Sequence, residues 1–187
     1  MKWAFFYELP CPDGYSELDT YRTMLGEIEY GESLGFDAVW LAELHFNRGL
    51  SILPSPMMVA ATVAARTKRL RLGIGVNVLA LTDPIRRAED AATLDLLSGG
   101  RLDFGVGRGH QAMAYEGFGV PMSEARERIL ENLEILRKAW TEESFSFQGK
   151  FRQFPNLSVA PKPVQKPHPP IWMARSEERR VGKECRL

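Results

Sequence analysis

The sequence contains little of what several common kinds of functional site require. Its 187 residues include two cysteines, Cys11 and Cys185, so we expect neither a disulfide framework nor a cysteine metal cluster, and we predict no metal site. Lys plus Arg and Asp plus Glu number 24 each. A chain without net charge gives no reason to expect binding to nucleic acid or to an anionic membrane.

Long hydrophobic segments are also missing. The chain has no run of about 18 apolar residues and no apolar core of a secretory leader, so we expect no membrane-spanning segment and a cytoplasmic location. No Gly-x-Gly-x-x-Gly motif follows the first apolar segment, which argues against a dinucleotide-binding fold. With 44% hydrophobic and 26% charged residues, the composition is that of one globular domain with a sizeable core.

The middle of the chain carries the clearest structural pattern. Leu70–Val78 and Arg101–Val106 are apolar segments of strand length. Between them, Asp83–Pro84 is typical of a helix start and Ser98–Gly100 of a helix end. This spacing predicts two parallel strands joined by a right-handed helical crossover. The buried helix face is predicted to contain Ile85, Ala88, Ala92 and Leu96, while Arg86, Arg87, Glu89 and Asp90 are predicted to point elsewhere.

Strands and helices alternate along the rest of the chain. The further strands are predicted at Lys2–Tyr7, at Phe36–Leu41 and from Ile171, and the further helices at Glu17–Leu34, Pro56–Arg66 and Ser123–Trp140. Phe145–Phe154 alternates in polarity and predicts a short hairpin. Because the strands are apolar on both faces, we predict an α/β fold, namely a (β/α)8 TIM barrel. A full barrel needs roughly 250 residues, so the barrel is predicted to be truncated after about five strands.

The chain changes character near its carboxyl end. Residues 175–187 (RSEERRVGKECRL) replace an apolar strand by charged sequence, and residues 175–185 resemble the translation of a widely used sequencing adapter. We therefore predict a partial barrel domain over residues 1–174 and a non-native tail over residues 175–187. The alternative for the tail is a solvated helix.

Small and polar residues follow two neighbouring predicted strands, at the edge where parallel α/β folds bind ligands. Gly107, Arg108 and Gly109 offer backbone N–H groups and a guanidinium, which suit a phosphate group. The alternative is a turn with a surface arginine. The backbone at Gly75–Val76 could lie against a flat ligand, or Gly75 could simply allow close packing.

Two ionisable residues follow another predicted strand. Glu43 and His45 are two positions apart, so their side chains are predicted to point the same way. A carboxylate beside an imidazole could orient a ligand or move a proton, and a purely structural contact is the alternative. Asn77 could bind the amide-like edge of a ligand or cap a turn, and His110 could contact a phosphate or lie in an exposed loop.

Four motifs together resemble the bacterial luciferase-like flavin monooxygenases. They are GFDAVWLAELHF (Gly35–Phe46), RLGIGVNVL (Arg71–Leu79), DPIRRAEDAATLDLLSGGRLDFGVGRG (Asp83–Gly109) and PHPPIW (Pro167–Trp172). The resemblance covers residues 1–174. It implies a (β/α)8 barrel that binds reduced flavin, activates O2 and inserts one oxygen atom into an organic substrate.

The resemblance also implies roles for individual residues. Arg108 and the amide of Gly109 would hold the flavin phosphate. Glu43 and His45 would lie near the flavin ring or the substrate. Gly75–Val76 falls where members of the family have a non-prolyl cis peptide bond behind the flavin ring.

Two departures separate the chain from the luciferases proper. These have two adjacent histidines after the glutamate, where this chain has Leu44 and His45, and a reactive cysteine where it has Gly107. We therefore expect no light emission from a long-chain aldehyde. The predicted function is a non-luminescent monooxygenase that uses reduced FMN, with Asn77 lining its cavity.

Two alternatives remain open for this function. One is a deazaflavin (F420)-dependent hydride-transfer enzyme, and the other is a non-catalytic flavin-binding protein. The expected partners of the monooxygenase are a small organic substrate, O2 and a flavin reductase that supplies reduced flavin. The full-length protein is expected to be a homodimer.

Overall fold

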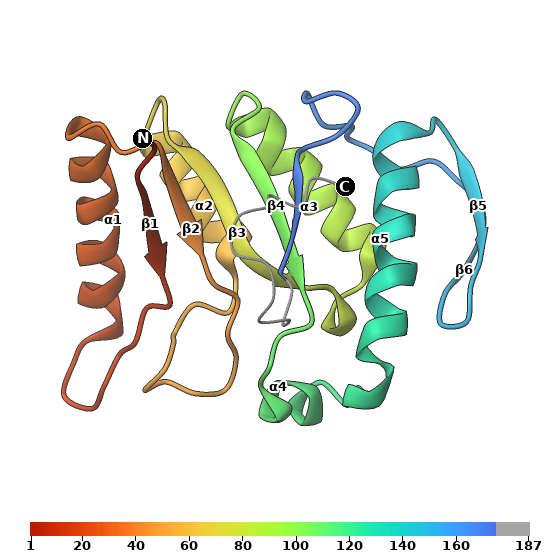
Figure 1. The fold of residues 1–187 in the computed structure, drawn as a ribbon, viewed down its shortest axis with the longest axis horizontal. Coiled ribbons are helices and arrows are strands. Elements are labelled where there is room, and N and C mark those ends of the chain that lie inside the picture. Colours follow the sequence, from red (N-terminus) through yellow and green to blue (C-terminus); the bar gives the residue numbers. More distant parts are fainter. Residues whose placement is uncertain (175–187) are drawn as a thin grey trace.

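A five-stranded parallel sheet forms the centre of the molecule (Figure 1). The computed structural model describes residues 1–174, so the predicted tail at residues 175–187 lies outside the described part. The strands are β1 (Ala4–Tyr7), β2 (Ala38–Leu41), β3 (Arg71–Val78), β4 (Leu102–Gly107) and β7 (Ile171–Met173). They lie in the order β1-β2-β3-β4-β7, and every neighbouring pair is parallel. The predicted α/β fold with parallel strands is confirmed.

The connections between the strands are mostly helical. The long helices are α1 (Glu17–Ser33), α2 (Pro56–Arg66), α3 (Pro84–Leu97) and α5 (Ala125–Thr141); α4 (Ala112–Gly117) and the 3-10 turns η1 (Leu79–Leu81) and η2 (Met122–Glu124) are short. In Figure 1, α2 and α3 lie behind the sheet, while α1 and α5 flank it. The predicted hairpin is confirmed as the antiparallel pair β5 (Phe145–Gln148) and β6 (Gln153–Leu157), which lies beyond α5.

Local sequence signals fix both ends of α3. The Asp83 side chain accepts hydrogen bonds from the backbone N–H groups of Ile85 (3.0 Å) and Arg86 (3.1 Å), and Pro84 occupies the first helical position. Gly99 and Gly100 have φ values of 65° and 82°, which allow the sharp turn into β4. The chain returns through α3 against the strand direction, so the first turn of α3 lies near the carboxyl edge of the sheet.

The hydrophobic core lies between the sheet and the helices. Alternate strand residues are fully buried on this face, namely Val39, Leu41, Leu72, Ile74, Phe104 and Val106. Burial of each large apolar side chain contributes about 1.5–3 kcal/mol. Trp140 of α5 packs edge-on against Phe104 and donates its indole N–H to the carbonyl of Ala88 at 3.0 Å, which joins α5 to α3 and the sheet.

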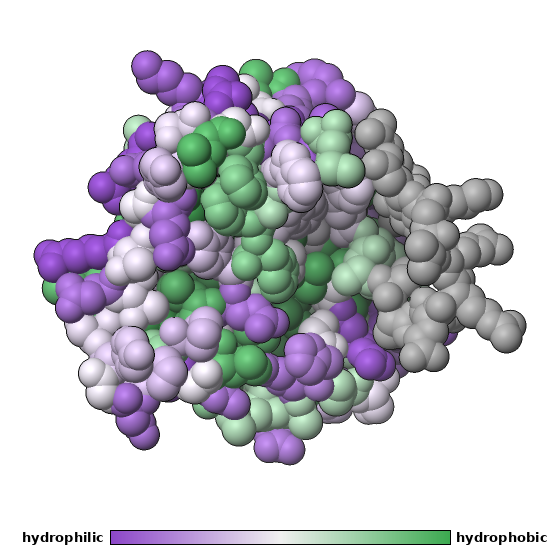
Figure 2. Space-filling model, turned by 60° about the vertical axis from the view of Figure 1, so that its left-hand side comes forward, coloured by the Kyte–Doolittle hydropathy of each residue, from purple (hydrophilic) through white to green (hydrophobic). Residues whose placement is uncertain are grey.

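The opposite face of the sheet is built from glycines and aromatic rings. A Cβ atom at Gly73 would overlap the ring of Trp40, and Trp40 meets Trp172 edge-on with ring centroids 5.9 Å apart. Near the β1 edge, the side chains of Trp3 and Phe6 are 59% and 60% exposed. Figure 2, which brings the α1 and β1 side of the molecule forward, shows hydrophobic residues among hydrophilic ones over the middle of the surface in view.

The sheet does not close on itself. Within residues 1–174, β1 pairs only with β2, and β7 pairs only with β4. Both strands therefore leave one edge without a strand partner in the described part of the chain. The predicted barrel is accordingly present as a partial, open barrel.

One prediction for the face of α3 is wrong. Leu96 was expected in the core but is 47% exposed, whereas the neighbouring Asp95 is fully buried. Asp95 accepts hydrogen bonds from the backbone N–H (2.9 Å) and the side-chain amide (2.6 Å) of Gln165. The carboxylate anchors the proline-rich segment before β7, and its partner Gln165 satisfies the charge on the inward side of the helix.

Candidate functional site

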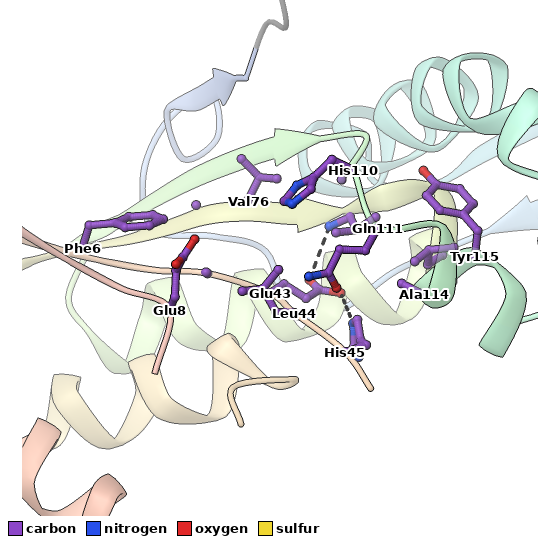
Figure 3. Close-up of a pocket in the computed structure, with 15 residues that line it drawn as sticks. Phe6, Glu8, Glu43, Leu44, His45, Val76, His110, Gln111, Ala114 and Tyr115 are labelled. Carbon is purple, nitrogen blue, oxygen red and sulfur yellow. Dashed lines mark hydrogen bonds and ion pairs between the residues drawn. The ribbon is translucent and has the colours of Figure 1, made fainter. Parts of the chain in front are cut away.

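A pocket lies at the carboxyl ends of the strands, where β1, β2 and β3 end and α4 begins (Figure 3). Its volume is about 160 Å³. Ligand pockets usually have volumes of about 300–1,000 Å³, so this pocket is smaller than a usual ligand site. The ionisable side chains that line it include Glu8, Glu43, His45, His110 and Tyr115.

Glu43 is the buried acid of this pocket. Its side chain is 4% exposed, and Oε1 lies 3.3 Å from Nε2 of His45, whose side chain is 11% exposed. Oε2 accepts the backbone N–H of Val78 at 3.4 Å. The structure thus brings the predicted pair together, with His45 as the more accessible partner toward the pocket.

Arg87 is a third partner of Glu43. The prediction that the Arg87 side chain points away from the buried side of α3 is therefore wrong. Its guanidinium Nη2 lies 3.4 Å from Oε2 of Glu43, and its side chain is 13% exposed. The first turn of α3 reaches the carboxyl edge of the sheet, so a long side chain there extends over the end of β3. Pattern analysis treats charged helix residues as solvent-facing, and for that reason it missed Arg87.

Gly75 and Val76 form the pocket wall contributed by β3. The peptide bond between them is cis, as the family resemblance predicts. The pairing register between β3 and β4 shifts between Ile74 and Asn77. A Cβ at Gly75 would lie 3.2 Å from the ring of Phe6, so glycine leaves room for this aromatic side chain against the strand.

Asn77 does not line the pocket, contrary to expectation. It is fully buried, and its amide Nδ2 donates to the carbonyl of Gly105 on β4 at 2.8 Å. Its Oδ1 is buried without a hydrogen-bond partner among the described residues. Because the register shifts just before Asn77, strand alternation did not predict the direction of this side chain.

Gly107, Arg108 and Gly109 lie beside the pocket in different surroundings. Gly107 is buried, and a Cβ there would approach Cγ2 of Val76 to 2.6 Å, so this glycine allows close packing. Arg108 is exposed, and its guanidinium has no hydrogen bond or ion pair with any of residues 1–174. Gly109 lines the pocket with a φ of 68°, a conformation that favours glycine.

Tyr115 was missed by the sequence analysis. It is 2% exposed, and its hydroxyl donates to the backbone carbonyl of Arg108. Burial raises the pKa of Tyr115, and the nearby Arg108 charge lowers it by a smaller amount. The phenol stays protonated at neutral pH and ties α4 to the segment that carries Arg108. No local pattern marked this tyrosine, because α4 is too short to show one.

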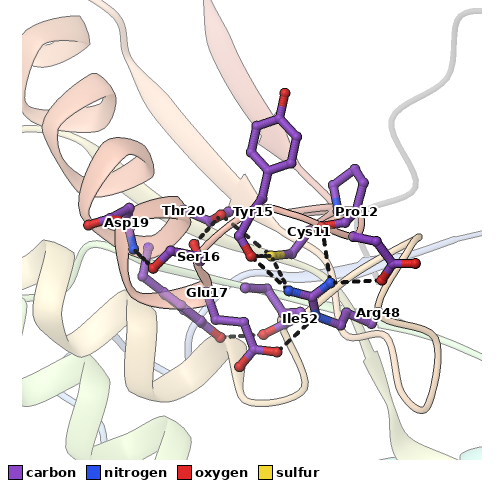
Figure 4. A network of polar contacts seen from close by, with 11 residues as sticks. Cys11, Pro12, Tyr15, Ser16, Glu17, Asp19, Thr20, Arg48 and Ile52 are labelled. Atoms are coloured by element: carbon purple, nitrogen blue, oxygen red, sulfur yellow. Dashed lines mark hydrogen bonds and ion pairs between the residues drawn. The ribbon is translucent and has the colours of Figure 1, made fainter.

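The loops that follow β1 and β2 are tied together by Arg48 (Figure 4). Its guanidinium donates to the carbonyls of Pro12 (3.0 Å) and Tyr15 (2.8 Å) and to a carboxylate oxygen of Glu17 (3.1 Å). A fourth contact, 3.3 Å from Nη2 to Sγ, reaches the buried Cys11. The loop that begins at Glu8 and the loop that follows His45 therefore hold each other in place.

A family profile described as "Luciferase-like monooxygenase" matches residues 1–182. The chain belongs to the luciferase-like monooxygenase family. Among its relatives in this family, the oxygenase component of the flavin-dependent trigonelline monooxygenase of Acinetobacter baylyi is 33% identical over 93% of this chain and 49% of the relative. The alkanal monooxygenase alpha chain of the Kryptophanaron alfredi symbiont is 30% identical over 92% of this chain and 48% of the relative.

Solved structures of the family agree with the fold. The crystal structure of monooxygenase RslO1 from Streptomyces bottropensis matches with a TM-score of 0.90 at 33% identity, over 94% of this chain and 54% of that one. The chain thus spans about half the length of the relatives it matches. Its sheet and helices correspond to about half of a luciferase-like barrel.

The residues of this luciferase-like chain can be compared with what a flavin requires. The exposed guanidinium of Arg108, which has no hydrogen-bond or ion-pair partner among residues 1–174, and the backbone of Gly109 could hold a phosphate. The ring of Phe6 and the backbone of Gly75–Val76 give a flat, largely apolar wall that suits a planar ring system. The donor set therefore fits an FMN-like ligand.

Residues 1–174 contain no group of three or more His, Cys, Asp or Glu side chains arranged to hold a metal ion. None of their helices combines the length and the apolar character that crossing a membrane requires.

Proposed function

We propose that the whole protein is a flavin-dependent monooxygenase that uses reduced FMN and O2 to insert one oxygen atom into a small organic substrate. Membership of the luciferase-like monooxygenase family supports the reaction class. The observation that carries the proposal is the pocket at the strand ends. There the Glu43–His45 pair, the Gly75–Val76 backbone and the segment of Arg108 lie around one cavity.

Each group has a proposed task in this site. Arg108 and the N–H of Gly109 bind the phosphate, and Gly75–Val76 supports the ring. When bound, reduced flavin would activate O2 and supply the oxygen atom. Glu43 orients His45 by accepting its Nε2–H, and His45 holds or moves a proton at its imidazole ring.

The apolar lining of the pocket has a task as well. Ala42, Leu44, Val78 and Leu81 line it together with Phe6. Apolar walls keep water away from a reactive oxygen species and strengthen electrostatic interactions inside the site. Leu44 stands where luciferases proper have a histidine, and Gly107 where they have a cysteine. These two differences support a non-luminescent enzyme.

The protein is further proposed to work in the cytoplasm as a homodimer with a separate flavin reductase. The relative from Acinetobacter baylyi is named as the oxygenase component of its system, and this name supports a separate supplier of reduced flavin.

Oxygen consumption by the whole protein tests the proposal. The protein is mixed with photoreduced FMN, O2 and a panel of small organic substrates, and product is detected by mass spectrometry with 18O2. One 18O atom per product molecule and no light with a long-chain aldehyde are the expected results. Substrate reduction by reduced F420 without 18O incorporation would favour hydride transfer. Tight flavin binding without turnover of any substrate would favour a non-catalytic flavin-binding protein.

A further inference from the structure

The ion pair of Arg87 and Glu43 differs from the structural ion pairs of this protein. Arg71 and Asp103 form a two-pronged pair, with Nε to Oδ2 at 2.6 Å and Nη2 to Oδ1 at 2.8 Å. Arg87 makes one long contact of 3.4 Å with Glu43, although both side chains are more than 85% buried. Its Nε is also buried and has no hydrogen-bond partner among the described residues.

A buried cation with a single long contact contributes little to stability. Removing charges from water costs several kcal/mol per ion, and only close, saturated hydrogen bonding offsets that cost. The position of Arg87 is therefore poorly explained by stability. Within residues 1–174, Arg87 is the only Lys or Arg within 4.0 Å of Glu43.

We propose that Arg87 is a positioning residue of the site: it holds the Glu43 carboxylate so that Glu43 determines which ring nitrogen of His45 carries the proton. Oε2 of Glu43 faces two donors, the Arg87 guanidinium and the Val78 N–H. Both of these groups can only donate, so Oε2 accepts and the carboxylate turns Oε1 toward His45. A carboxylate oxygen can only accept.

The consequence appears at His45. Because Oε1 accepts, Nε2 of His45 must donate across the 3.3 Å contact, and in the neutral ring Nδ1 is then left as the acceptor. The rings of Phe118 and His45 pack nearly perpendicular to each other, with centroids 4.9 Å apart. Arg87 thus acts on the pocket through Glu43, without contacting the ligand.

NMR of the flavin-free whole protein tests this inference. The 15N signals of the His45 ring, identified by their loss in His45→Asn, report which nitrogen is protonated. In Arg87→Met we expect these signals to move toward a mixture of the two tautomers, and in Arg87→Lys to stay near wild type. Arg86→Met is the matched control, because Arg86 is 73% exposed and contacts Glu89 and Asp90 instead. Unchanged His45 signals in a folded Arg87→Met protein would overturn the inference.

A second measurement covers the case in which Arg87→Met does not fold. The Nε–H signal of Arg87 is recorded in Glu43→Gln, where the proposed partner has lost its charge. A shift of this signal is expected, and no shift would contradict the inference.

The effect on turnover is a separate readout, because it rests on the proposed function. With reduced FMN, Arg87→Met should lower kcat by about 100-fold, the scale of a misplaced catalytic group, with flavin affinity unchanged. If the NMR result holds but no variant turns over any substrate, the proposed function fails and the role of Arg87 stands. If turnover is normal while the His45 signals move, Arg87 sets the tautomer of His45 as inferred, and the chemical role proposed for His45 fails instead.

Discussion

Replacing Arg108 by alanine is expected to weaken the binding of FMN by the whole protein and to leave the binding of riboflavin nearly unchanged. The two ligands differ by the phosphate group alone. The Arg108 guanidinium is exposed and makes no hydrogen bond or ion pair with residues 1–174, so its removal breaks no polar contact within the described part of the chain. The change in affinity then measures the contact with the ligand.

The size of the effect follows from that environment. A hydrogen bond to a charged group contributes about 1.5–3 kcal/mol, which corresponds to a change of about 10-fold to 150-fold in Kd. Because the guanidinium is exposed to solvent, the lower part of this range is expected. The midpoint of thermal unfolding should not move.

Flavin fluorescence titrations provide the assay, with FMN and riboflavin measured against wild type, Arg108→Ala and Arg126→Ala. Arg126 is a matched control, since it is an exposed arginine on α5 that does not line the pocket. Equal losses of affinity for FMN and riboflavin in Arg108→Ala would refute the phosphate assignment. The same result would make Arg108 a residue that supports the shape of the loop.

Three further outcomes are expected. His45→Asn should lower turnover by roughly 10²–10⁴-fold, with little change in FMN affinity or unfolding temperature. Steady-state kinetics and calorimetry check this, and unchanged turnover by folded protein would count against a chemical role of His45. At Glu32, burial raises the pKa of the carboxyl, but the hydrogen bonds from the backbone N–H groups of residues 68–70 together lower it by more. The pKa of Glu32 therefore lies below the ordinary 4.5. The carboxylate therefore stabilises the fold above pH 4.5 and this contribution is lost as the pH falls through the lowered pKa. Glu32→Gln should be less stable than wild type at pH 7, with a difference that shrinks in acid, and a pH-independent difference in urea unfolding would contradict this. Expressed as the 187-residue chain, the protein should self-associate through the edges of β1 and β7 that have no strand partner within residues 1–174, and a monomer in analytical ultracentrifugation would show otherwise.

Some features of this protein follow from short stretches of sequence. The order of strands and helices is local in origin, because Asp83–Pro84 caps α3 and Gly99–Gly100 ends it without help from distant residues. The pairing of Glu43 with His45 is local too. Two positions at a strand end place both side chains on one side, and the 3.3 Å contact agrees with that expectation.

Other features required the tertiary structure, because they depend on residues far apart in the chain. Arg87 reaches Glu43 across 44 positions, and Asp95 accepts a hydrogen bond from the side chain of Gln165, which is 70 positions away. Asn77 faces β4 because the register shifts beside it. The periodicity of a helix or strand predicts which side of the element is apolar. Whether a charged side chain is buried depends instead on where its partner lies. That position is set only when the sheet and the helices have packed.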